Sequence, residues 1–390
     1  MWSGVDACLK CTLCITQCPV VSVNPDFPGP KALGPEWYRQ KQRGGVATLP
    51  HVDDCTFCQL CEAACPVEVP IAHLIALHKA AATPPLRIRV RDGILARPHR
   101  AARWTRWAGT SRVMRKVGGI SGKTSLPRPR RARWSPSSLG QPLGPCQGRV
   151  GLFVDCYSAG YDGEVVEQAS QLLTLWGFNV TLMPQGSHCC GAAAYAAGKP
   201  QLAEREARET WSAMGRFQDV DFLVTLNATC DATLRDEWPD YFGIEPPMPV
   251  VPFDEMALRA PQEFWNRLGR VSSSAEVRIM THTTCRGQVA RGDGHLGELA
   301  HRAGFHRVEP SDAPCCGAAG AYAFKIEHED TAQQLVARLV EQSSHVRPQG
   351  IFTDSGTCAL HIEQATQVKT RHPAYWLYRQ YLEYQKGEAP

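Results

Sequence analysis

The chain has 390 residues, of which 43% are hydrophobic and 21% are charged, and its formal net charge is +4. This length allows two or three domains, and the composition is ordinary for a globular protein rather than a disordered one. No stretch approaches the roughly 18 consecutive apolar residues of a membrane-spanning helix, and the first residues lack the pattern of a secretory signal. We therefore expect a protein of the cytosol or of the cytoplasmic face of a membrane.

The cysteines are the strongest signal. Seventeen are too many for packing alone, and without a signal peptide they favour metal or redox chemistry over a disulfide scaffold. The first 65 residues contain two runs of four, each spaced C-x2-C-x2-C-x3-C and followed by proline. The runs are Cys8, Cys11, Cys14 and Cys18, and then Cys55, Cys58, Cys61 and Cys65.

The spacing of both runs is that of bacterial-type [4Fe–4S] sites, in which three cysteines of one run share a cluster with the fourth cysteine of the other. We therefore predict two [4Fe–4S] clusters within residues 1–83. A pair of zinc sites is the alternative, but zinc sites usually show paired C-x2-C units rather than runs that end in Cys-Pro. The predicted ligand sets are Cys8, Cys11, Cys14 and Cys65 for the first cluster, and Cys55, Cys58, Cys61 and Cys18 for the second.

After a predicted helix over residues 66–83, which Pro84 and Pro85 end, the sequence becomes strongly basic. Between residues 87 and 133 there are fifteen Lys and Arg and one acidic residue. We interpret residues 84–148 as a segment that docks on an anionic membrane surface or a partner, with a solvated linker as the alternative. No nucleic-acid fold signature accompanies the charge, so nucleic acid is not expected as a partner. On a helix, four residues of this segment share the face that would meet lipid: Trp104, Trp107, Ser111 and Met114.

From residue 149 the sequence alternates predicted strands with predicted helices and then repeats itself. The alternation favours two parallel sheets with right-handed crossovers, which we assign to domains 149–270 and 271–390. The predicted strands cover residues 149–156, 178–184, 221–230, 276–285, 305–310 and 350–358. The predicted helices cover residues 163–177, 201–217, 295–304 and 331–342.

Each half carries four cysteines just past the carboxyl ends of its strands, where open α/β sheets build their sites. We expect each set to converge on one edge of its sheet as ligands of one centre. The adjacent cysteines are more plausibly two ligands than a disulfide, because neighbouring Cα atoms are too close for an unstrained bridge. Gly191 and Gly317 would let the backbone pass close to what is bound. The first set is Cys156, Cys189, Cys190 and Cys230, and the second is Cys285, Cys315, Cys316 and Cys358. Cys146 lies outside both sets.

Two ferredoxin motifs followed by a duplicated Cys-Cys-Gly (CCG) region resemble a known family of iron–sulfur subunits. It includes heterodisulfide reductase B and C subunits and the iron–sulfur subunits of glycolate, lactate and glycerol-3-phosphate dehydrogenases. The likeness is strongest to the C subunits of the anaerobic glycerol-3-phosphate dehydrogenases. It implies an α+β fold overall, with an N-terminal helical, ferredoxin-like domain for two [4Fe–4S] clusters and two tandem α/β CCG domains. The segments that carry it are residues 23–35, 229–240, 315–325 and 353–366.

The resemblance implies an electron-transfer subunit. It would accept electrons from a separate flavoprotein, most specifically one that oxidises sn-glycerol 3-phosphate, and pass them toward membrane quinone. It also implies peripheral attachment at the cytoplasmic face of the membrane. In agreement, no G-x-G-x-x-G follows a strand and no other sign of a flavin site is present. We therefore expect no catalytic residues and no substrate turnover by the chain alone.

The chain departs from the family pattern at the C-x-x-C pair that ends each repeat, where Asn227 and Ser355 replace the first cysteine. Four thiols per half remain for one or two further clusters, [4Fe–4S] or [2Fe–2S], or for zinc, and Ser355 is a candidate oxygen ligand. His188 and His282 are interpreted equally as ligands or as structural side chains. The alternative functions are disulfide or heterodisulfide reduction at the CCG site, service to a glycolate or lactate dehydrogenase, and a membrane adaptor whose clusters are only structural.

Overall fold

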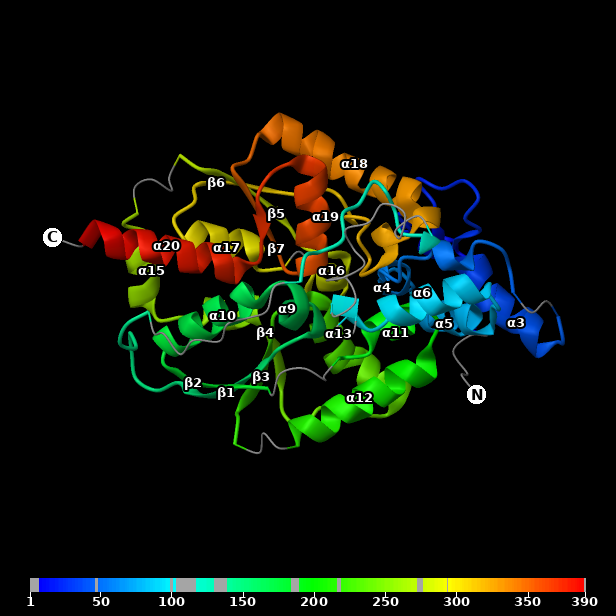
Figure 1. Ribbon diagram of the computed structural model, residues 1–390, viewed down its shortest axis with the longest axis horizontal. Helices are drawn as coiled ribbons and strands as arrows, with labels where there is room; N and C mark the ends of the chain where they lie inside the picture. Colours follow the sequence, from blue (N-terminus) through cyan, green and yellow to red (C-terminus); the bar gives the residue numbers. More distant parts are fainter. Residues whose placement is uncertain are drawn as a thin grey trace.

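The computed structural model describes residues 7–45, 48–98, 101–102, 117–129, 139–183, 189–215, 219–271, 276–292 and 294–388. Figure 1 shows a helical N-terminal part in blue and cyan beside two α/β units, the first in green and the second from yellow to red. The predicted lipid-facing helix with Trp104, Trp107, Ser111 and Met114 lies outside the described residues, as does His188.

The N-terminal part consists of short helices packed around one longer helix, α5. Its core contains the fully buried side chains of Leu33, Trp37 and Leu74, and the His78 ring stacks on Trp37 at a centroid distance of 4.1 Å. The helix predicted before Pro84 is α5. The helices are α1 (Leu13–Thr16), α2 (Gly29–Lys31), the π-helical segment η2 (Ala32–Glu36), α3 (Trp37–Gln42), the 3₁₀ turn η3 (Val52–Asp54), α4 (Leu60–Ala63), α5 (Ile71–Ala81) and α6 (Leu86–Leu95).

The two cysteine loops of this part have the same backbone shape. Lys10 and Phe57 occupy equivalent positions with φ of 59° and 57°, and both are left-handed. Thr12 and Gln59, which precede α1 and α4, are also left-handed, with φ of 69° and 64°. The loops thus share both their cysteine spacing and their backbone conformation.

The first α/β unit is a parallel sheet in the order β2-β1-β3-β4. Its strands are β1 (Gly148–Phe153), β2 (Phe178–Leu182), β3 (Phe222–Thr225) and β4 (Val250–Pro252). Its helices are α9 (Cys156–Tyr161), α10 (Gly163–Leu175), α11 (Ala192–Ala196), α12 (Pro200–Met214), α13 (Ala228–Ala232), the π-helical segment η4 (Thr233–Phe242), α14 (Phe253–Leu258) and α15 (Gln262–Leu268).

The second unit repeats this topology in the order β6-β5-β7-β8, again all parallel. The predicted fold class is therefore confirmed. The strands are β5 (Arg278–His282), β6 (Arg307–Pro310), β7 (Gly350–Thr353) and β8 (Thr370–Arg371). The helices are α16 (Cys285–Arg291), α17 (Leu296–Arg302), the 3₁₀ turns η6 (Tyr322–Phe324) and η7 (Ile326–His328), α18 (Glu329–Val346), α19 (Gly356–Thr366) and α20 (Pro373–Glu388).

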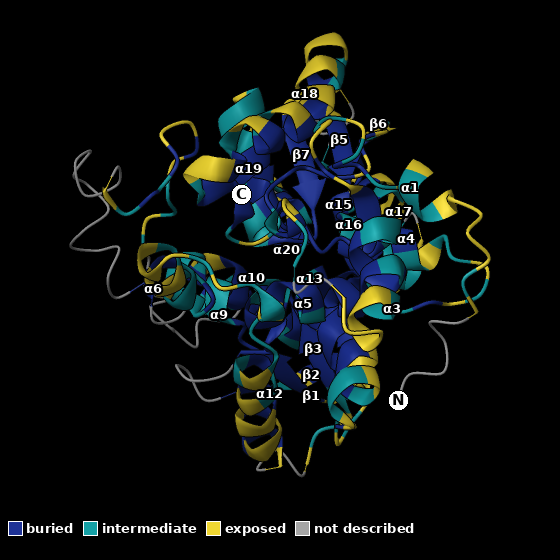
Figure 2. Cartoon of the chain, turned by 90° about the vertical axis from the view of Figure 1, so that its right-hand side faces the viewer, coloured by how far each residue is buried: buried dark blue, intermediate teal, exposed yellow. Residues whose placement is uncertain are grey.

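One hydrophobic core connects the two units. Trp176 and Phe264 of the first unit belong to the same buried cluster as Phe352 and Tyr381 of the second. Helix α20 leaves the second sheet and packs on α10 and α15 of the first unit. Figure 2 shows the buried strands at the centre and the exposed faces of α12 and α18 at opposite ends. The two units are thus held together by apolar packing.

Several described residues of the basic segment pack against the second unit. Arg91 of α6 forms an ion pair with Glu327, and Lys123 lies 2.6 Å from Asp330. Ile120 forms a β-bridge with Lys325. On its outer side α6 exposes Leu86, Val90 and Ile94. None of the helices that the structure describes is both long and apolar enough to cross a membrane.

We predict that Gly317→Ala destabilises the protein much more than Gly320→Ala. Both glycines have positive φ, 76° and 63°, but a Cβ at Gly317 would lie 2.6 Å from Ala332 O, whereas one at Gly320 meets nothing. Positive φ costs an L residue about 1–2 kcal/mol, and overpacking adds about 1–3 kcal/mol at Gly317 only. Urea unfolding followed by circular dichroism measures both, and equal losses would contradict the prediction.

Candidate iron–sulfur centres

The first ferredoxin loop brings the predicted first ligand set together. Burial, followed by the neighbouring side chains of Cys8, Cys11 and Cys65, raises the pKa of Cys14. Cys65 comes from the second run and acts on Cys14 of the first, so the two runs lie near each other here, and the exchange of the fourth cysteine stays a prediction. Cys11 is exposed, and Leu9 and Leu13 beside it are 65% and 44% exposed. This site therefore lies at the surface.

The second ferredoxin loop is more deeply buried. Cys58 and Cys61 are buried, and burial together with the thiolates of Cys58, Cys55 and Cys18 raises the pKa of Cys61 well above its usual value. A small cavity of about 10 Å³ is lined by all four cysteines of the predicted second set. The backbone N–H of Phe57 donates to Cys55 Sγ at 3.4 Å. The loop thus surrounds a closed, thiol-lined space.

In the first α/β unit the four cysteines lie at the carboxyl edge of the sheet. Cys156 follows β1, the Cys189–Cys190 pair lies between β2 and α11, and Cys230 is in α13 after β3. The Sγ atoms of Cys189 and Cys156 are 3.7 Å apart, and those of Cys190 and Cys230 are 3.5 Å apart. Hydrogen bonds with Cys189 and Cys230 lower the pKa of Cys190 well below its usual value. The four thiols of the first unit therefore lie in two contacting pairs at the sheet edge.

The second unit repeats this arrangement. Cys285 begins α16 after β5, the Cys315–Cys316 pair follows β6, and Cys358 is in α19 after β7. Hydrogen bonding to Cys315 and burial raise the pKa of Cys285, and hydrogen bonding to Cys358 and burial raise the pKa of Cys316. All four thiols therefore lie in two contacting pairs at one sheet edge.

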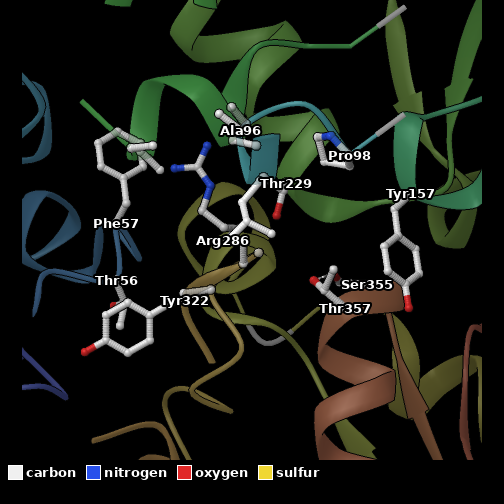
Figure 3. Close-up of a pocket in the computed structure, with 18 of the residues that line it drawn as sticks. Thr56, Phe57, Ala96, Pro98, Tyr157, Thr229, Arg286, Tyr322, Ser355 and Thr357 are labelled. Carbon is white, nitrogen blue, oxygen red and sulfur yellow. Dashed lines mark hydrogen bonds between the residues drawn. The ribbon is translucent and has the colours of Figure 1, made fainter. Parts of the chain in front are cut away.

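All eight cysteines of the two units line one cavity of about 200 Å³. The carboxyl edges of both sheets face it, and the ferredoxin part closes it with Cys55 and Phe57. Cys55 also borders the small cavity of the second ferredoxin loop. Figure 3 shows Thr56, Phe57 and Tyr322 on one side of the large cavity, Arg286 and Thr229 in the middle, and Tyr157, Ser355 and Thr357 on the other side.

The donor set fits iron–sulfur centres, because each site offers four thiols, most of them buried or half-buried. Buried thiolates are costly unless a bound metal centre shares their charge. Within the described ranges, no three His, Cys, Asp or Glu side chains are arranged to hold one metal ion. The four-ligand assignments remain predictions.

Asn227 and Ser355, which replace cysteine in the family pattern, both line the large cavity and both precede a helix. Asn227 caps α13, because its Oδ1 accepts a hydrogen bond from Thr229 N at 3.1 Å. Ser355 stands at the same position before α19, and its Oγ is 3.3 Å from Thr357 Oγ1. The substitutions therefore keep a helix start at both places while removing one thiol from each unit.

His282 does not line the cavity. His282 is the last residue of β5, and its Nδ1 lies 3.3 Å from Ser311 Oγ. Burial lowers the pKa of His282 to about 4. The interpretation as a structural side chain is thus favoured over a role as a ligand.

The residues that sequence reasoning missed are the charged ones between the units. Arg291 of α16 is 2.7 Å from Asp231, 3.0 Å from Asp354 and 3.5 Å from Asp254. Arg286 of the same helix is 2.6 Å from Glu237. The only sequence feature that could have pointed to these arginines is their position, because both follow Cys285 within one short helix.

Comparison with known proteins agrees with this architecture. Residues 4–69 match the model of a 4Fe-4S dicluster domain, and residues 150–235 and 279–363 each match the model of a cysteine-rich domain. The chain is therefore an iron–sulfur protein in which a dicluster domain precedes two cysteine-rich domains, as the motifs predicted.

Three relatives are similar over most of the chain. The C subunit of the anaerobic glycerol-3-phosphate dehydrogenase of Escherichia coli K12 is 26% identical over 95% of this chain and 97% of its own length. The B subunit of the fumarate reductase (CoM/CoB) of Methanothermobacter marburgensis is 24% identical over 92% of this chain and 68% of its own. The glycolate oxidase iron–sulfur subunit of Escherichia coli K12 is 24% identical over 94% of this chain and 91% of its own length. The family-level resemblance is thus supported.

We predict that Arg291→Met destabilises the protein by about 3–5 kcal/mol near pH 8, because it leaves buried carboxylates without their cation. The loss should be smaller near pH 5. Burial already raises the pKa of Asp231 to about 6 and raises that of Asp354. An acid whose folded pKa is raised lowers stability as the pH climbs above its unfolded value, and protonation relieves this cost.

The matched control is Arg291→Lys, which keeps the charge and should lose less than half as much. Urea midpoints at the two pH values measure both variants. An equal loss at both pH values would show that the carboxylates do not carry the effect.

Proposed function

We propose that the chain is the electron-transfer subunit of an oxidoreductase. The observation that carries this proposal is the shared cavity, onto which all eight cysteines of the two units and Cys55 of the second ferredoxin loop open. Cys55 also borders the small cavity of the second loop, so the two kinds of site adjoin. Bound iron–sulfur clusters supply one-electron transfer, so a two-electron donor would discharge in two successive steps.

The proposed path of the electrons has one end at the surface and one end in the interior of the protein. Cys11 and the apolar side chains of Leu9 and Leu13 are exposed, so an external redox partner can approach the first loop. Cys58 and Cys61 are buried, and they exclude water from the second loop. Electrons would therefore pass between a surface centre and the inner cavity through the second loop.

The partner we propose is a flavoprotein dehydrogenase, most specifically one that oxidises sn-glycerol 3-phosphate, with membrane quinone as the eventual acceptor. The similarity to the C subunit of the anaerobic glycerol-3-phosphate dehydrogenase, over nearly the whole chain, supports this choice. Peripheral attachment to the cytoplasmic membrane face is part of the proposal, supported by the basic segment and by the exposed Leu86, Val90 and Ile94 of α6.

Disulfide reduction at the two cysteine-rich sites is the second candidate, favoured by the cavity between them. Asn227 and Ser355 weigh against it, because each unit has one thiol fewer than the pattern for two-electron disulfide cleavage. Formation of thiols from a disulfide in the presence of a reducing dye would favour this candidate over the relay.

We predict between about 12 and 16 iron per chain after anaerobic purification, since two ferredoxin clusters account for about 8 and the cysteine-rich sites for the rest. Iron, sulfide and zinc analysis measures this, together with spectra of the oxidised and reduced protein. A value of about 8 with zinc bound would remove the cysteine-rich sites from the relay.

We also predict that the pure chain does not oxidise sn-glycerol 3-phosphate, but that it transfers electrons to a quinone analogue when the flavoprotein is added. Cys18→Ser should slow this transfer at least tenfold, because it removes a thiol from the second loop's cavity. Cys146→Ser is the matched control, since Cys146 is exposed and outside every set. Substrate oxidation by the chain alone would refute the subunit role.

A further inference from the structure

Arg286 is a buried cation at the point where the three parts of the chain meet. It follows Cys285 in α16, is 5% exposed and lines the large cavity. Its guanidinium carbon lies 6.0 Å from the ring centre of Phe57, which stands between Cys55 and Cys58 in the second ferredoxin loop. Figure 3 shows the side chain between Phe57 and Thr229 of the first unit. One cation therefore lines the cavity onto which cysteines of all three parts open.

Two of the guanidinium nitrogens have no hydrogen-bond partner among the described residues. Nη2 donates to Glu237 Oε1 at 2.6 Å, whereas Nε and Nη1 have no acceptor. Both oxygens of Glu237 are engaged, because Gln59 Nε2 donates to Oε1 and Thr233 Oγ1 donates to Oε2, each at 2.8 Å. Buried N–H groups without an acceptor are costly, so these donors need a partner that occupies the cavity.

Arg291, in the same helix and equally buried, has a different environment. Three carboxylates lie within 3.5 Å of it, and it does not line the cavity. Arg286 has one carboxylate and faces the thiol-lined space instead. Arg291 therefore joins the two units, whereas Arg286 is directed at the cavity that the cysteines line.

We propose that Arg286 sets the reduction potential of the centres around this cavity by donating its free N–H groups to their sulfur atoms. The inference rests on the proposed function, since it takes the cysteines to hold redox-active clusters. Each reduced cluster carries one more negative charge than the oxidised one, so a nearby cation and its N–H donors stabilise the reduced form and raise the potential.

The test is a redox titration followed by electron paramagnetic resonance on the anaerobic holoprotein and on the double variant Arg286→Met/Glu237→Gln. The double variant removes the ion pair as a neutral unit, so Glu237 is not left buried without its cation. We expect the equilibrium constant for reduction to fall about tenfold, or about 59 mV for one electron, at the second ferredoxin centre and at the cysteine-rich centres. The first ferredoxin centre should not move, because none of its four predicted ligands lines the cavity.

Two single variants complete the design. Arg286→Lys keeps the charge but not the fixed N–H directions, so its potentials should fall between those of the wild type and the double variant. If the double variant does not hold its clusters, the reduction potentials of Arg286→Lys decide the test by themselves. Arg291→Lys, in the same helix, should leave every potential unchanged.

The inference is overturned if the second ferredoxin centre keeps its potential in the Arg286 variants, or if the first centre moves by the same amount. Failure of the proposed function gives a different result. The cysteine-rich sites would then show no redox signal even in the wild type, while the second ferredoxin centre would still report whether Arg286 acts on it.

Discussion

The chain must turn away immediately after each pair of adjacent cysteines, and only glycine has room to do so. A Cβ at Gly191 would lie 2.7 Å from Ala203 O of α12, and one at Gly317 would lie 2.6 Å from Ala332 O of α18. Because this contact is made by backbone, α12 and α18 pack directly against the cysteine loops. Both thiols of each pair then face the sheet edge where the cysteines after the neighbouring strands arrive, and the shared cavity depends on that approach.

The same cavity gathers groups that resist burial together. Buried thiols and carboxylates favour their neutral forms because they lose contact with water. Two arginines of one helix, Arg286 and Arg291, place positive charge beside these groups. Arg291 balances carboxylates that come from both units, so it helps to fix how the sheets face each other. Arg286 lines the cavity of the cysteines and has two nitrogens without a hydrogen-bond partner among the described residues. Charge balance and site architecture are therefore two results of the same short helix, α16.

Much of the fold and of the candidate site was predictable because the signals are local. The apolar runs before Cys156 and Cys285 predict strands, although β1 ends at Phe153 and β5 at His282, so that each cysteine begins the helix that follows its strand. The regular spacing around Cys58 is typical of a ferredoxin loop. The meeting of both sheet edges at one cavity was not predictable, because it depends on packing between residues far apart in sequence, such as Trp176 and Tyr381. The same holds for the charge network around Arg291, whose carboxylates are scattered along the chain. The residues around Trp104 lie outside the described structure, so the membrane-facing helix stays a prediction.

The return of α20 to the first unit has a consequence for how the protein is made. A ribosome delivers α20 after both sheets, and apolar side chains of this helix, such as Leu377 and Tyr381, belong to the core that joins them. All eight cysteines of the two ferredoxin loops are translated much earlier, because they lie within the first 65 residues. The ligands of the ferredoxin-type sites are therefore present while the chain is still growing, although Glu237, which accepts a hydrogen bond from Gln59 of the second loop, follows later. The cavity between the sheets reaches its final form only after α20 has emerged. The order of translation thus imposes an order on the assembly of the centres.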